Sequence, residues 1–147
     1  MKVSEIMTKN PAYCVDTESL EHVARMMADH DCGCIPVVDD LQTKRPIGTI
    51  TDRDITVRTI AKGKNPSNMV VGEIMTDQPV TIGEDASFDE CCRTMEKNQI
   101  RRIVVVNKEG ECVGMVAQAD VARKTGEHET AELVKEVSAS GKRLAAA

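Results

Sequence analysis

Thr51 and Asp54 are the residues whose types and spacing have the clearest chemical potential, because a hydroxyl precedes a carboxylate by three positions. They follow Gly48 at the point where an apolar strand runs into a helix. One interpretation is a capping box, in which each side chain binds an N–H group of the first turn. The other is a ligand site. Free N–H groups beside a glycine suit a polar ligand, and the carboxylate can accept hydrogen bonds from ribose hydroxyls.

An internal duplication positions this pair. Residues 3–8 (VSEIMT) recur as 71–76 (VGEIMT), and a proline follows each copy, at Pro11 and Pro79. In the same register, Asp54 matches Asp120, whereas Ala117 stands where Thr51 carries its hydroxyl. The second copy therefore lacks the reciprocal capping pair, although its acid is retained.

Each repeat is predicted to be strand, helix, strand, strand, helix, which gives an α/β fold. The first helices have apolar residues at i, i+3, i+4 and i+7, with Thr17 and Asp85 as expected N-caps. β-Branched runs predict the strands. The expected strands are 13–15, 35–39 and 47–51, then 80–82, 103–107 and 113–117, and the second helices are 52–61 and 119–124. Residues 62–68 read as a linker, and 130–137 as a further amphipathic helix that packs on the module or on a partner.

Charge and composition exclude several functions. The net charge is -5 and the pI is about 5.2, which argues against sequence-independent binding of nucleic acid or an anionic membrane. Tyr13 and Phe88 are the only aromatic residues, so no platform for stacking bases is expected. The N-terminus resembles no signal peptide, and no run is long enough to span a membrane. A cytoplasmic protein with reduced thiols is expected, and residues 145–147 resemble a cloning remnant.

Rival chemistry has weaker support. Cys32 and Cys34 supply two thiols, but a structural zinc site usually needs four ligands, and small apolar lining is the favoured interpretation. No nucleophile–base–acid set, phosphate-binding loop or catalytic carboxylate pair is evident. We therefore expect no enzymatic activity, no resident cofactor and no metal.

The two EIMT openings, the 35–39 strand and residues 48–54 (GTITDRD), each with its counterpart, together resemble a tandem pair of cystathionine-β-synthase-type (CBS) domains, a Bateman module, over residues 1 to about 126. The resemblance implies two repeats packed sheet to sheet with pseudo-twofold symmetry. It also implies clefts that bind AMP, ADP, ATP or S-adenosylmethionine, a regulatory role and a homodimer. The expected domains are 1–65 and 66–126, with a tail at 127–147.

The resemblance also implies which residues line each cleft. The first would combine the ribose acceptors with an aliphatic base pocket and two arginines for phosphate. Its residues are Thr51, Asp54, Met75, Val80, Ile100, Arg101 and Arg102. The second cleft lacks the hydroxyl and the arginines, and it is expected to be weaker, empty or selective for a less charged ligand. Its residues are Met7, Ala12, Cys32, Gly33, Cys34 and Asp120.

The favoured function is a sensor of an adenosine-containing ligand that signals its occupancy to an unidentified partner protein. One alternative is a ligand-independent dimerisation scaffold in which Thr51 and Asp54 only cap a helix. A thiol or metal sensor that uses Cys32 and Cys34 is the third interpretation.

Overall fold

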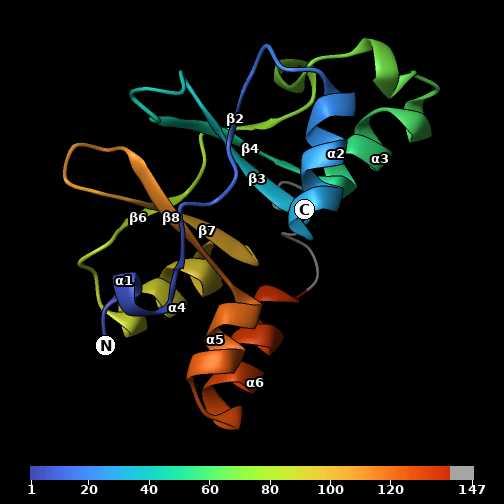
Figure 1. Cartoon of the computed structure of the whole chain (residues 1–147). Helices are drawn as coiled ribbons and strands as arrows, with labels where there is room; N and C mark the ends of the chain where they lie inside the picture. The colour runs from blue at the N-terminus through green and yellow to red at the C-terminus, as the bar shows by residue number, and fades with distance from the viewer. Residues whose placement is uncertain (140–147) are drawn as a thin grey trace. The chain divides into compact units, whose positions relative to one another are not determined.

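The computed structural model describes residues 1–139 of the 147-residue chain. The suggested cloning remnant at 145–147 lies outside this range. The chain divides into two compact units. We call Ala12–Pro79 the middle unit, and Met1–Pro11 together with the chain from Val80 onward the terminal unit (Figure 1).

The middle unit contains a four-stranded sheet in the order β2-β3-β4-β5. Strand β2 is parallel to β3, and the other neighbours are antiparallel. Helix α3 directly follows β4, so the end of that strand positions the side chains at the start of the helix. The elements are β2 (Cys14–Val15), α2 (Leu20–His30), β3 (Cys34–Val38), β4 (Pro46–Thr51), α3 (Asp52–Arg58), the 3₁₀ turns η1 (Ile60–Lys62), η2 (Pro66–Asn68) and η3 (Val71–Glu73), and β5 (Thr76–Asp77).

The terminal unit repeats this plan with the sheet order β1-β8-β7-β6. It adds a helix at each end of its sequence, α1 and α6. The elements are α1 (Val3–Ile6), β1 (Thr8–Lys9), β6 (Thr81–Gly83), α4 (Phe88–Asn98), β7 (Arg102–Val106), β8 (Cys112–Ala117), α5 (Gln118–Lys124) and α6 (Glu127–Val137). The predicted strand-helix-strand-strand-helix order and the α/β class are confirmed, with most boundaries within one or two residues; α3 ends three residues before its predicted end and α6 begins three residues before its predicted start.

The short strands that follow the EIMT motifs are exchanged between the repeats. Strand β1, from the start of the chain, pairs with β8 in the second repeat. Strand β5, which follows the second motif, pairs with β4 of the first repeat. In Figure 1 the blue N-terminal segment accordingly belongs with the yellow and orange elements of the terminal unit. Each compact unit is therefore built from residues of both sequence repeats.

The predicted N-caps are wrong by two residues. Ser19 caps α2, and its Oγ accepts the His22 N–H at 3.1 Å; Ser87 caps α4 in the same way through Glu90. Thr17 and Asp85 lie outside the helices because the two serines already have the extended backbone of a cap and form isolated β-bridges. The capping oxygen must belong to the residue just before the first turn, which the serines occupy.

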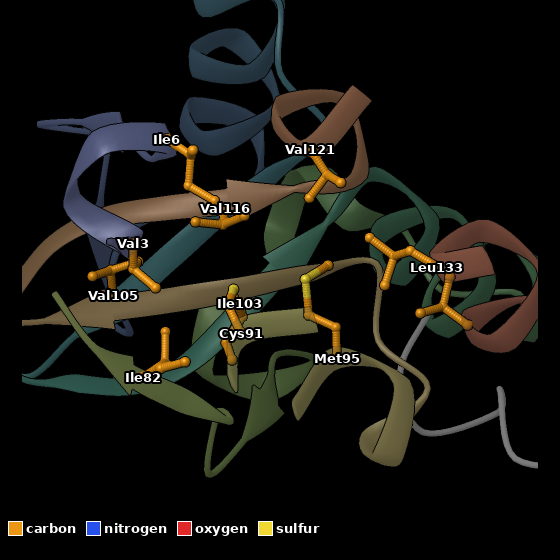
Figure 2. Close-up of a cluster of buried hydrophobic side chains, with 11 residues drawn as sticks. Val3, Ile6, Ile82, Cys91, Met95, Ile103, Val105, Val116, Val121 and Leu133 are labelled. Atoms are coloured by element: carbon orange, nitrogen blue, oxygen red, sulfur yellow. The ribbon is translucent and has the colours of Figure 1, made fainter. Parts of the chain in front are cut away.

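Helix α6 completes the core of the terminal unit. Leu133 and Val137 are each 1% exposed and join a cluster that α1, α4 and the sheet share (Figure 2). Of the two positions left open for this helix, the structure shows packing on the module. The cluster comprises Val3, Ile6, Ile82, Cys91, Met95, Ile103, Val105, Val116, Val121, Leu133 and Val137.

The core of the middle unit is equally aliphatic. Its members come from one face of α2, from the strands β2, β3 and β4, and from the segment before β5. They are Cys14, Leu20, Val23, Met27, Ile35, Val37, Ile50, Val71 and Ile74. Among residues 1–139, none of the helices has the length and apolar character that a membrane span requires.

Candidate functional site

Thr51 and Asp54 form the capping box that their spacing predicts. Thr51 Oγ1 accepts the Asp54 N–H at 3.0 Å, and Asp54 Oδ2 accepts the Thr51 N–H at 3.1 Å. Both residues are buried, with exposures of 5% and 2%. The reciprocal bonds hold the carboxylate in one orientation at the junction of β4 and α3.

The expectation of free N–H groups at this helix start is wrong. Asp52 N–H donates to the Gly33 carbonyl at 3.1 Å, and Arg53 N–H donates to Asp52 Oδ1 at 2.9 Å. The third group, Asp54 N–H, donates to Thr51. Because the N–H groups of the first turn already have acceptors, the helix start has no free donor for an anionic ligand. A ligand could instead donate a hydrogen bond to the Asp54 carboxylate.

Gly48 also has a different role from the one expected. A Cβ at this position would lie 2.6 Å from the Thr76 carbonyl oxygen and 3.0 Å from Met75 Sδ. The space beside the glycine is therefore filled by β5, which pairs with β4 through Gly48↔Asp77 and Thr49↔Thr76. The glycine admits a neighbouring strand and the Met75 side chain, and not a ligand.

One oxygen of Asp54 has no hydrogen-bond donor. Within the described part of the chain, Asp54 Oδ1 is buried and accepts no hydrogen bond. The nearest cation is Arg58, whose Nε lies 3.6 Å from Oδ1 while its Nη1 donates to the Ile74 carbonyl at 2.8 Å. A buried carboxylate oxygen without a donor is costly, so a hydrogen-bond donor from a ligand would be stabilised here.

Sequence reasoning did not identify Arg58. The available signal was its position four residues after Asp54 on a helix, the spacing at which an acid and a base lie on the same face. The hydrogen bond from Arg58 to the Ile74 carbonyl depends on how the segment before β5 lies beside α3. A local sequence pattern does not predict that contact.

The matching acid, Asp120, is fully supplied with donors. Its Oδ2 accepts the Ala117 N–H at 2.8 Å, and its Oδ1 accepts the Thr8 hydroxyl at 3.4 Å and a bond from Arg123. Asp120 is 5% exposed. Ala117 returns no bond, as predicted, so this helix start has half of a capping box. The two acids thus differ in whether an acceptor oxygen remains available.

The other predicted residues of the first cleft are divided between the units. Met75 lies with Thr51 and Asp54 in the middle unit, and it packs on Gly48. Val80, Ile100, Arg101 and Arg102 belong to the terminal unit. Arg101 is exposed and Arg102 half-buried, and neither side chain forms a hydrogen bond or ion pair within residues 1–139.

The residues predicted for the second cleft are divided in the same manner. Met7 and Asp120 lie in the terminal unit, where Met7 packs against Gly114. Ala12, Cys32, Gly33 and Cys34 lie in the middle unit. The combination of each set into one cleft stays a prediction.

Cys14 and Cys91 are buried thiols, whereas Cys32 and Cys34 are half-buried. Burial raises the pKa of Cys14 to about 12, and burial raises the pKa of Cys91 to about 12. Thiols with such pKa values are protonated and unreactive at neutral pH. Among the residues that the structure describes, no group of three or more His, Cys, Asp or Glu side chains is placed to hold a metal ion.

The chain is similar in sequence and in fold to known proteins. The family model described as CBS domain matches residues 3–58 and 71–127. Hypoxic response protein 1 of Mycobacterium tuberculosis is 34% identical over 133 residues, which cover 90% of this chain and 91% of that protein. A crystal structure of hypoxic response protein I with two coordinated zinc ions has a TM-score of 0.74 and 31% identity, covering 86% of this chain and all of the other.

Two further solved structures contain adenosine compounds. The CBS domain pair of protein MJ0100, in complex with 5'-methylthioadenosine and S-adenosylmethionine, has a TM-score of 0.75 and 28% identity, covering 86% of this chain and 100% of the other. The CBS domain protein PAE2072 of Pyrobaculum aerophilum, complexed with AMP, has a TM-score of 0.75 and 26% identity, with 92% and 99% coverage. Two matched domains, in register with the internal duplication, show that the chain belongs to the CBS domain family.

Proposed function

We propose that this CBS pair is a regulatory module that binds an adenosine-containing ligand, AMP, ADP, ATP or S-adenosylmethionine, with the ribose on Asp54. The observation that carries the proposal is the buried Oδ1 oxygen of Asp54, which accepts no hydrogen bond from the described residues. A ribose hydroxyl would donate to this oxygen. The ligands of the MJ0100 pair and of PAE2072 support the choice of an adenosine compound.

The remaining contacts follow from the family resemblance. Thr51 would contact the ribose, and Met75, Val80 and Ile100 would line the base pocket. Arg101 and Arg102 would bind phosphate, which suits the absence of a side-chain partner for either within residues 1–139. The set around Asp120 would bind more weakly or remain empty, because Asp120 already accepts three hydrogen bonds.

Signalling would be a population shift. A ligand changes a conformational equilibrium only to the extent that it binds one arrangement more tightly than another. For coupling of ~1–3 kcal/mol, the phosphate contacts are the natural source of that difference. The regulated partner protein would bind the arrangement that the ligand favours. Homodimer formation, which the resemblance implies, and a cytoplasmic location, which the sequence itself predicts, are tested by sedimentation and by cell fractionation.

The decisive experiment measures the melting temperature with each of the four ligands for the wild type, Asp54→Asn and Asp52→Asn. Asparagine at 54 keeps an oxygen for the Thr51 N–H but removes the carboxylate that the hydroxyls need. Asp52 provides a matched control because it is an exposed acid on the same helix. At a ligand concentration of about 100 times Kd, binding stabilises the folded state by about 2.7 kcal/mol.

We expect a ligand-dependent rise in melting temperature for the wild type and Asp52→Asn, and none for Asp54→Asn. The scaffold alternative has its own support, because the capping box is complete without a ligand. It is preferred if none of the four compounds shifts the wild type. The lack of tryptophan and the single tyrosine allow a second test, since any co-purified adenine would dominate the ultraviolet spectrum.

A further inference from the structure

Helices α3 and α5 occupy matching positions in the two repeats, but the buried acid of each helix has different hydrogen-bond donors. Each has seven residues, with the acid at the third position, Asp54 or Asp120. Three residues after the acid, α3 has Val57 and α5 has Arg123. This difference decides which donor reaches the carboxylate.

In the terminal unit the arginine at this position binds the acid. Arg123 Nη2 donates to Asp120 Oδ1, and the pair is formed although the arginine side chain is 65% exposed and the acid side chain 7%. A hydroxyl of a ligand would have to displace this guanidinium, in addition to the 3.4 Å bond from Thr8, to reach the same oxygen.

In the middle unit the corresponding side chain offers no donor. Val57 is apolar and 40% exposed. The arginine that follows it, Arg58, is held by the Ile74 carbonyl, and its Nε lies 3.6 Å from Asp54 Oδ1, beyond hydrogen-bond distance. Asp54 therefore keeps an acceptor oxygen that Asp120 has lost.

We propose that the residue three positions after each acid determines whether that acid is available to a ligand. Arg123 is an internal competitor that closes Asp120 to ribose hydroxyls, and Val57 keeps Asp54 open. This inference rests on the proposed function, in which the hydroxyls bind the carboxylate. It identifies two residues outside the predicted ligand contacts as determinants of how many ligands bind.

The test transfers the closing residue to the open helix. Val57→Arg should place a guanidinium on Asp54 Oδ1, because the same spacing on the matched helix gives that contact for Arg123. Val57→Leu is the control, because leucine also replaces valine with a longer side chain that is unbranched at Cβ, but it has no N–H group to donate to Asp54. By isothermal titration with AMP, we expect Val57→Arg to weaken binding about tenfold or more, equivalent to one charge-assisted hydrogen bond, and Val57→Leu to bind as the wild type.

The reverse change is the double variant Arg123→Val with Ala117→Thr, which gives the second repeat the residues found at positions 57 and 51 of the first. We expect its stoichiometry for AMP to rise from one to two. A ligand-free measurement checks the contact itself. Val57→Arg should raise the melting temperature relative to Val57→Leu by about 2 °C, because it supplies a donor to a buried oxygen.

The outcomes separate this inference from the proposed function. Wild-type binding that Val57→Arg does not weaken overturns the inference and leaves the function intact. Binding by the double variant alone, with none of the four ligands binding the wild type, rejects both the ribose site on Asp54 and the role of Val57 in keeping that site open. If none of AMP, ADP, ATP and S-adenosylmethionine binds either the wild type or the double variant, both are rejected.

Discussion

Gly48→Ala tests the finding that β5, and not a ligand, fills the space beside the glycine. The new methyl group would lie 2.6 Å from the Thr76 carbonyl oxygen and 3.0 Å from Met75 Sδ. Met75 can change its rotamer, but the carbonyl belongs to the β4–β5 ladder and moves only with the strand. Overpacking of this kind typically lowers the free energy of unfolding by about 1–3 kcal/mol.

The assay is urea unfolding at equilibrium, with Gly83→Ala as the matched control. A Cβ at Gly83, also on a strand, would meet nothing within 4 Å, so that variant should stay within about 0.5 kcal/mol of the wild type. For a chain of this size, each kcal/mol lowers the melting temperature by about 2–4 °C. Equal stabilities for the two variants would show that β5 does not press on Gly48, and the assignment of that glycine would be wrong.

Three further predictions follow from burial and charge. Leu133→Ala should lower the free energy of unfolding by about 2–5 kcal/mol because that side chain is 1% exposed, whereas the 40% exposed Val134→Ala should change it little; chemical denaturation compares them. The hydrogen bond from Thr43 lowers the pKa of Asp39 below 3.8 in the folded protein, so the contribution of Asp39 to stability is present above pH 3.8 and is lost as the pH falls through the pKa of the folded state. Asp39→Asn should therefore weaken the loss of stability at acid pH in a plot of unfolding free energy against pH, and an unchanged plot would contradict this. Cys91, with its pKa raised to about 12 by burial, should resist alkylation in native protein and react once urea unfolds it, as mass spectrometry would show.

Local patterns predicted the secondary structure well. The β-branched runs, the helical apolar spacing and the duplication identify every strand-helix-strand-strand-helix element, because each depends on residues a few positions apart. The same patterns missed β1 and β5, which have two residues each. Strands so short exist only because a distant strand, β8 or β4, supplies their hydrogen bonds.

The candidate site was predicted in part. The reciprocal bonds of Thr51 and Asp54 follow from their spacing and the helix start, and both are present. The prediction of free N–H groups at the start of α3 was wrong. The Asp52 N–H donates to the Gly33 carbonyl, which lies nineteen positions earlier in the chain and could not be identified from local spacing. The expected grouping of Arg101 and Arg102 with this pair stays a prediction.

By itself, the sequence determined the duplicated fold, the paired acids and the family, since these are properties of local spacing repeated in register. Tertiary structure decided what each acid can do. Asp54 and Asp120 occupy the same position in matched helices, yet one retains a buried oxygen without a donor and the other has none. The difference arises because Arg123 and Thr8 both donate to Asp120 Oδ1, whereas Val57 offers Asp54 no donor and Arg58 is drawn to the Ile74 carbonyl. A carboxylate's availability depends on all the donors that the fold brings to it, and for Asp120 these include Thr8, 112 positions away in the sequence, as well as its near neighbours Ala117 and Arg123.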